Sequence, residues 1–129
     1  MQAITPPTLS EQTSNSYTFP IIGDLDQMVN VIDMTALTLT LRDRNTGAII
    51  NNRQDQDVFQ TNNVVVTTQT GPPLLTVATW LIQPADTPVV TPGTPYEIHD
   101  AIFRWYWDSG TRTQVHQMAF AIEHLWHLP

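Results

Sequence analysis

The chain has 129 residues and no cysteine. Charged residues make up 13% of it, and its formal net charge is −7. This length predicts one domain with its own core, and the lack of cysteine excludes disulfides. The five basic residues are all arginines scattered along the chain, so binding to nucleic acid or to an anionic membrane is not expected. We expect no signal peptide and no membrane span, because no basic start or long apolar run occurs.

Residues 1–24 differ in composition from the rest of the chain. The stretch "MQAITPPTLSEQTSNS" is polar and proline-rich, and alone it buries too little apolar surface to order itself. A free terminus is the ordinary interpretation. We expect instead an extended arm that docks on a neighbouring subunit, because Pro6-Pro7 stiffens the chain and lowers the cost of ordering it. The predicted protein-interface residues of this arm are Ile4, Pro6, Pro7, Leu9, Tyr17, Phe19 and Ile21.

The next segments show the period-two alternation of β-strands. Residues 16–24 are a short β candidate, and residues 25–34 are either one helical turn or a loop. Further strands are predicted at 35–43, 63–69 and 74–82, with a turn at 43–47, a short return at 48–51 and a polar loop at 52–57. A proline-rich crossover at 83–95, with a helical turn at 84–87, leads to a hairpin of strands 96–108 and 111–125.

Large aromatic side chains dominate this hairpin. At period two, Phe103, Trp105 and Trp107 share one face of its first strand. They line an aromatic binding groove or fill a core. We favour the core, where each buried ring contributes roughly 1.5–3 kcal/mol. The predicted core residues are Leu37, Leu39, Leu41, Trp80, Phe103, Trp105, Trp107, Met118, Phe120 and Ile122.

Short strands separated by Gly, Pro and Asn turns predict an all-β fold, an immunoglobulin-like two-sheet β-sandwich with an extended N-terminal arm. A small barrel is the main alternative. The predicted domains are the arm (1–24), the sandwich (25–125) and a tail (126–129). In the tail, Trp126 and Leu128 are further candidate interface residues, although Trp126 could equally fold back over its own sandwich.

No motif predicts an enzyme. The paired carboxylates Asp24/Asp26 and Asp55/Asp57 lie among loop residues, where solvated side chains are expected. Ser109 lies in a turn, and no nucleophile elbow or phosphate-binding loop occurs. The turn after Asp43 does not continue as a calcium loop, because its twelfth position is Gln54.

The histidines predict no cofactor. His124 and His127 could chelate a metal, but a zinc site needs a third ligand, and no spacing rule links them to His99 or His116. If a metal is bound, it could sit on a symmetry axis to which each subunit contributes. We therefore expect no cofactor and no metal.

Three stretches carry a resemblance to a known group of proteins. "LTLTLRDRNTGAIINNRQDQDV", "TVATWLIQPADTPVV" and "EIHDAIFRWYWDSGTRTQVHQMAFAI" resemble small immunoglobulin-like structural proteins of tailed bacteriophages. The shared pattern is a Thr/Leu strand, a D-x-x-T-G-x-x-I-N turn, a Trp-x-Leu-x-Pro-x-D stretch and a closing aromatic hairpin. The resemblance covers residues 37–122.

The resemblance implies a virion protein, expected on the outer surface of the head. In the head decoration (cement) role, it would clasp neighbouring major capsid subunits, and it is expected to form a homotrimer. The alternatives are a neck, collar, tail-fibre or baseplate attachment module of the same virion. A carbohydrate-binding sandwich that stacks glycans on Trp105, Trp107 or Trp126 is a third hypothesis, and a small hydrolase is the least favoured.

Overall fold

The computed structural model of the chain describes residues 8–10, 14–91 and 93–123. These ranges contain eight strands and three 3-10 helices and, within them, no helix long and apolar enough to cross a membrane. The strands are β1 (Thr8–Ser10), β2 (Asn15–Pro20), β3 (Met34–Asp43), β4 (Gln56–Asp57), β5 (Val64–Gln69), β6 (Leu75–Ile82), β7 (Tyr96–Trp107) and β8 (Arg112–Glu123). The 3-10 helices are η1 (Asp24–Asp26), η2 (Val31–Asp33) and η3 (Pro84–Asp86).

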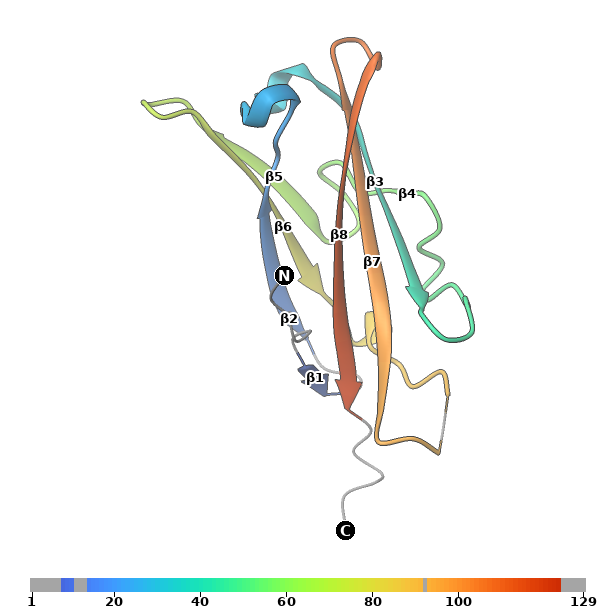
Figure 1. Cartoon of the computed structure of the whole chain (residues 1–129). Coiled ribbons are helices and arrows are strands. Elements are labelled where there is room, and N and C mark those ends of the chain that lie inside the picture. The colour runs from blue at the N-terminus through green and yellow to red at the C-terminus, as the bar shows by residue number, and fades with distance from the viewer. Residues whose placement is uncertain (1–7, 11–13, 92, 124–129) are drawn as a thin grey trace.

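The strands form two sheets that pack against each other (Figure 1). One sheet has the order β1-β8-β7-β3-β4 and the other the order β2-β6-β5. Strand β1 pairs with β8 in parallel, and every other pairing is antiparallel. Across the three-stranded sheet, β2, β6 and β5 take the places of strands B, E and D of an immunoglobulin domain. Across the other sheet, β8, β7, β3 and β4 take the places of strands G, F, C and C′. The predicted all-β two-sheet sandwich is therefore confirmed.

The core lies between the sheets and contains the predicted residues. On β3, Leu37, Leu39 and Leu41 are fully buried and alternate with more exposed threonines. Phe103, Phe120, Ile122 and Trp80 are also completely buried. Trp107 and Met118 are only partly buried, and both pack against the same cluster.

The aromatic hairpin fills this core, as expected. The side chain of Trp105 is 2% exposed, and its indole N–H donates to the Ile22 carbonyl at 3.0 Å. The ring of Phe103 lies edge-on to that of Trp80, with 5.7 Å between ring centroids. Arg104 faces away from the core, because neighbouring residues of a strand point to opposite faces.

The structure corrects the expected role of the N-terminal segment. Strand β2 pairs along its whole length with β6, so residues 15–20 belong to the sandwich and not to a separate arm. Phe19 and Ile21 are not interface residues, because they are 1% and 0% exposed, and Tyr17 is partly buried and packs against the core cluster. Their alternation places all three on the inward side of the strand. Leu9 is likewise buried, opposite Ile122.

The loops largely agree with the sequence-based expectations. The ambiguous residues 25–34 hold the helices η1 and η2 before β3 begins, and the predicted helical turn near Pro84 is η3. The short return at 48–51 is an isolated bridge between Ile49 and Arg42 rather than a strand. The candidate interface residues Ile4, Pro6, Pro7, Trp126 and Leu128, and the histidines His124 and His127, lie outside the described residues.

Candidate interaction surface

The outward side of the three-stranded sheet carries no charged residue among its described side chains. On β6, the buried Thr76, Ala78, Trp80 and Ile82 alternate with side chains that point away from the core. The same alternation holds on β2 and β5. The outward residues, called the uncharged face below, are Ser16, Thr18, Pro20, Val65, Thr67, Gln69, Leu75, Val77, Thr79 and Leu81.

Apolar and hydroxyl side chains lie next to one another across this face. Thr79 lies at its centre, opposite Thr18 on β2 and Val65 on β5. The hydroxyl groups of Thr18 and Thr79 are 3.1 Å apart and hydrogen-bonded to each other. Val65 is 48% exposed and Leu81 44%, so the face presents large apolar side chains to its surroundings.

The outward side of the five-stranded sheet is different. It carries the exposed arginines Arg42 and Arg104, and the Arg44 guanidinium forms an ion pair with Asp100 at 2.7 Å. Asp55 lies on a loop and Asp57 on the short edge strand β4, and both are exposed. In the described part of the chain, charge is thus distributed around the uncharged face and not on it.

At each edge of the three-stranded sheet, some backbone groups are already occupied or absent. The Gln60 side chain bonds both backbone groups of Val66 on β5, accepting from its N–H at 2.8 Å and donating to its carbonyl at 2.7 Å. On β2, the Ser16 N–H donates to Asn15 Oδ1, and Pro20 has no N–H. These positions cannot pair with an added strand, whereas the outward side chains of the face remain available for contact.

Sequence reasoning missed this face, although a signal was present. The chain has no charged residue between Asp57 and Asp86, a segment that includes β5 and β6. The inward side of both strands had to be apolar to form a core. The absence of charge on their outward side is the feature that distinguishes them from β3, β7 and β8.

No aromatic cleft accompanies this surface within the described ranges. Trp80 and Trp105 are buried, and Trp107 packs against the core cluster. Trp80 and Trp105 cannot stack on a glycan without unpacking the sandwich, whereas Trp107 is partly exposed and lines a surface cavity. The expected carbohydrate platform on Trp105 is therefore not present in the fold.

A buried ion pair ties three loops together near the end of β6. Arg53 is 2% exposed, and its Nε donates to Asp86 Oδ1 at 2.6 Å. The other guanidinium nitrogens donate to Gln56 and to groups of Asn62 and Asn63. The guanidinium also lies over the Trp80 ring, 6.0 Å from its centroid. Every nitrogen of Arg53 is used, so this network is structural.

A second polar cluster lies where β3 ends and β7 begins, and consists of Asp43, Glu97 and His99. Asp43 and His99 are paired across neighbouring strands, and Glu97 lies two residues before His99 on the same face. All three are buried. His99 Nε2 is 2.5 Å from Glu97 Oε2 and 3.9 Å from Asp43 Oδ1. One ligand atom from each residue lies within 4.8 Å of the other two, a spacing that could hold a metal ion.

The two carboxylates of this cluster have different surroundings. Glu97 accepts hydrogen bonds from the backbone N–H groups of Val90 and Thr91. Burial acts to raise the Glu97 pKa, but these hydrogen bonds and the one from His99 together hold the pKa below its ordinary value. Asp43 uses Oδ2 to accept from Thr46, whereas its buried Oδ1 has no hydrogen-bond partner among the described groups.

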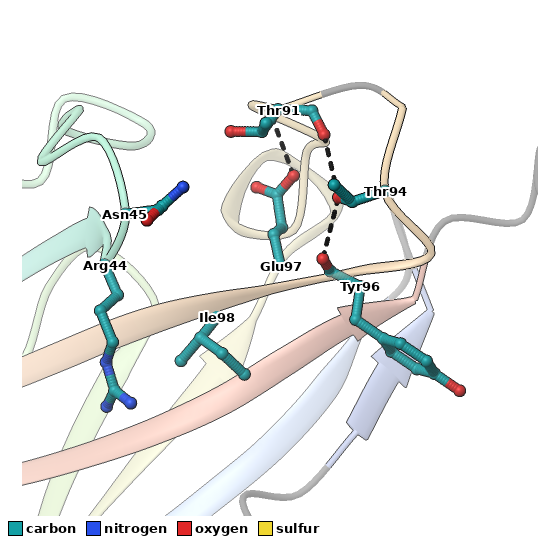
Figure 2. A pocket seen from close by; sticks show the side chains of 7 residues that line it. All are labelled: Arg44, Asn45, Thr91, Thr94, Tyr96, Glu97 and Ile98. Carbon is teal, nitrogen blue, oxygen red and sulfur yellow. Dashed lines mark hydrogen bonds between the residues drawn. The ribbon is translucent and has the colours of Figure 1, made fainter.

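A surface cavity of about 240 Å³ reaches this cluster. Figure 2 shows Glu97 pointing from β7 toward the loop that carries Thr91 and Thr94, with the Tyr96 ring turned away. Arg44 and Asn45 line the opposite side. Glu97 therefore connects the buried cluster to a cavity at the surface.

The remaining candidates from the sequence do not come together. Asp24, Asp55 and Asp57 are exposed, and Ser109 is an exposed turn residue. His116 accompanies neither His99 nor these acids. It stacks on Phe19 with ring centroids 4.7 Å apart and is hydrogen-bonded to the Tyr17 hydroxyl at 2.6 Å.

No match to this chain was found among protein-family models, curated proteins or solved structures.

Proposed function

We propose that this protein is a structural protein that binds another protein through the uncharged face, and that it decorates the outer surface of a tailed-bacteriophage head. The uncharged face carries the first part of the proposal. The second part rests on the resemblance of residues 37–122 to small bacteriophage structural proteins. In this role the protein clasps major capsid subunits by contact alone and catalyses no reaction.

Desolvation favours the uncharged face as the contact. Burying a charged side chain without a matched partner costs several kcal/mol, and the centres of protein interfaces are accordingly depleted of charge. Valine, leucine and threonine side chains at positions such as Val65, Leu81 and Thr79 can be buried without this cost. In a chain of net charge −7, this face can approach another acidic surface with the least repulsion.

The size of the face favours a shell over an isolated pair of copies. Strands about 4.8 Å apart, rising about 3.3 Å per residue, make the face roughly 15 by 25 Å, or of the order of 400 Å². A stable interface buries about 800 Å² on each partner. One such contact is therefore weak, whereas a shell offers each copy several neighbours and repeats the contact many times. A homotrimer, which the resemblance implies, would add contacts in the same way.

Matched glutamate substitutions test this proposal. Leu81→Glu places a charge on the uncharged face, and Val115→Glu places one on the outward side of the other sheet, at a similar exposure of 46% against 44%. Both variants should keep the Tm of the parent protein, because both side chains point outward. We expect Leu81→Glu to lose binding to empty heads, made from the capsid protein encoded with this chain, in a co-sedimentation assay. Val115→Glu should bind as the parent does.

The outcomes separate the alternatives. Normal head binding by Leu81→Glu would reject the uncharged face as the contact. If the parent protein does not bind heads at all, the decoration role is rejected. Its copy number in purified particles then decides whether it belongs to the neck, collar or tail of the virion, where copies are few, or is absent from the particle.

A further inference from the structure

The buried cluster of Asp43, Glu97 and His99 has an imbalance of charge. It brings two carboxylates and one imidazole together at almost complete burial. No nearby described arginine balances it: Arg42 is exposed on the opposite face of β3, Arg44 pairs with Asp100, and Arg53 pairs with Asp86. A protonated His99 would supply one positive charge against two negative charges. Buried charges require compensation, because desolvation penalises them strongly.

An unpartnered atom points into the cluster. Asp43 is 0% exposed, and its Oδ1 has no hydrogen-bond partner among the described groups. Its nearest basic atom there is His99 Nε2, 3.9 Å away, which is too far for a hydrogen bond. A buried carboxylate oxygen without a partner costs free energy unless a cation or another group satisfies it. The arrangement thus leaves an acceptor free at the position where three ligand atoms converge.

We propose that Asp43, Glu97 and His99 bind one divalent transition-metal ion of the zinc type. The ligand atoms are Asp43 Oδ1, Glu97 Oε2 and His99 Nε2. The imidazole selects zinc-like ions over Mg²⁺ and Ca²⁺, which prefer oxygen ligands only. The ion neutralises both carboxylates, and its bond to His99 Nε2 replaces the present contact of that atom with Glu97 Oε2.

The observed spacing needs only small adjustments. Ligand atoms about 2.1 Å from a tetrahedral zinc ion lie about 3.4 Å from one another. The distance from His99 Nε2 to Glu97 Oε2 must widen from 2.5 Å, and that to Asp43 Oδ1 must shorten from 3.9 Å. The fourth ligand is a water molecule, for which the cavity beside Glu97 provides the route of entry (Figure 2). The ion fastens β3 to β7 and, through Glu97, to the loop at Val90 and Thr91.

Zinc binding by the full chain, purified without a histidine tag, tests the proposal. Bound zinc is counted by mass spectrometry after dialysis, affinity is measured by calorimetry, and Tm is followed against added zinc, magnesium and calcium. We expect one zinc ion per chain and a Tm that rises by roughly 5–10 °C at a hundredfold excess over Kd. Magnesium and calcium should have little effect.

Four variants locate the ion. Asp43→Asn keeps an acceptor for Thr46 but removes the charge, and His99→Gln removes the imidazole. Each should weaken zinc binding about tenfold or more. Two matched controls should bind zinc as the parent does. Asp100→Asn changes a buried acid beside His99 that faces away from the cluster and pairs with Arg44. The double variant His124→Gln/His127→Gln removes the two histidines that lie close together near the end of the sequence and could chelate a metal by themselves.

Each result decides the proposal even if a cluster variant fails to fold. Imidazole ¹⁵N shifts of His99 in the parent protein should move at Nε2 when zinc is added. Absence of bound zinc, an unmoved His99 signal, or zinc lost only from the His124/His127 variant would overturn the site.

Discussion

Replacing Phe19 with alanine should destabilise the protein strongly, because β2 is part of the sandwich. Phe19 is 1% exposed, and its ring lies 4.5 Å from that of Phe103 and 6.0 Å from that of Trp105, measured between centroids. Truncating a buried phenylalanine removes its transfer free energy and leaves a cavity, at a cost of about 3–5 kcal/mol. For a chain of this length, that loss corresponds to a fall in Tm of roughly 10–20 °C.

Thr18→Ala is the matched control for this substitution. Thr18 is the neighbouring residue on the opposite face of β2, and its removal costs only an exposed hydrogen bond to Thr79, within about 0.5 kcal/mol. The free energy of unfolding of both variants is measured by urea denaturation followed by tryptophan fluorescence. If the m-value is unchanged, a shift in the denaturation midpoint reports a change in stability. If Phe19→Ala lost less than about 1 kcal/mol, β2 would be an appended arm and not a strand of the core.

Two further substitutions test the polar contacts. Arg53→Met should lower the free energy of unfolding in urea by about 3–5 kcal/mol, because it leaves Asp86 buried without its cation. Arg112→Met should lower it by less than about 1 kcal/mol, because the Arg112–Asp24 pair is half exposed. Equal losses would contradict the structural role of the Arg53 network. Burial lowers the His116 pKa below its ordinary value of 6.5, so His116 contributes stability fully above that pH and less as the pH falls below it. Between pH 7.5 and 5.5, the free energy of unfolding of His116→Gln should therefore fall by less than that of the parent protein. An identical pH dependence of this free energy in the two proteins would refute the assignment.

Period-two patterns predicted most of the fold because they depend only on neighbouring residues. Leu37, Leu39 and Leu41 are inward because alternate side chains of a strand share a face. The same pattern in Tyr17, Phe19 and Ile21 predicted a strand, but its partner β6 lies some sixty residues away in the sequence. Local alternation cannot identify so distant a partner, so the sequence alone favours an arm.

The polar sites were less predictable, and for two different reasons. Glu97 and His99 continue the inward positions of Phe103 and Trp105 on β7, and Asp43 continues those of Leu41 on β3. Following the alternation to the ends of both strands would have revealed that these ionisable groups point into the sandwich. Arg53 and Asp86 lie in loop and 3-10 segments without periodicity, so nothing local indicated that they meet.

Hydroxyl-radical footprinting of free and head-bound protein tests the central claim most directly, since it reports the exposure of individual side chains. Val65, Leu75 and Leu81 of the uncharged face are exposed in the folded chain, as are Tyr96 and Val115 on the outward side of the other sheet. We predict that the first three become protected in the bound state while Tyr96 and Val115 stay reactive. Protection of Tyr96 and Val115, with the uncharged face still reactive, would contradict the account.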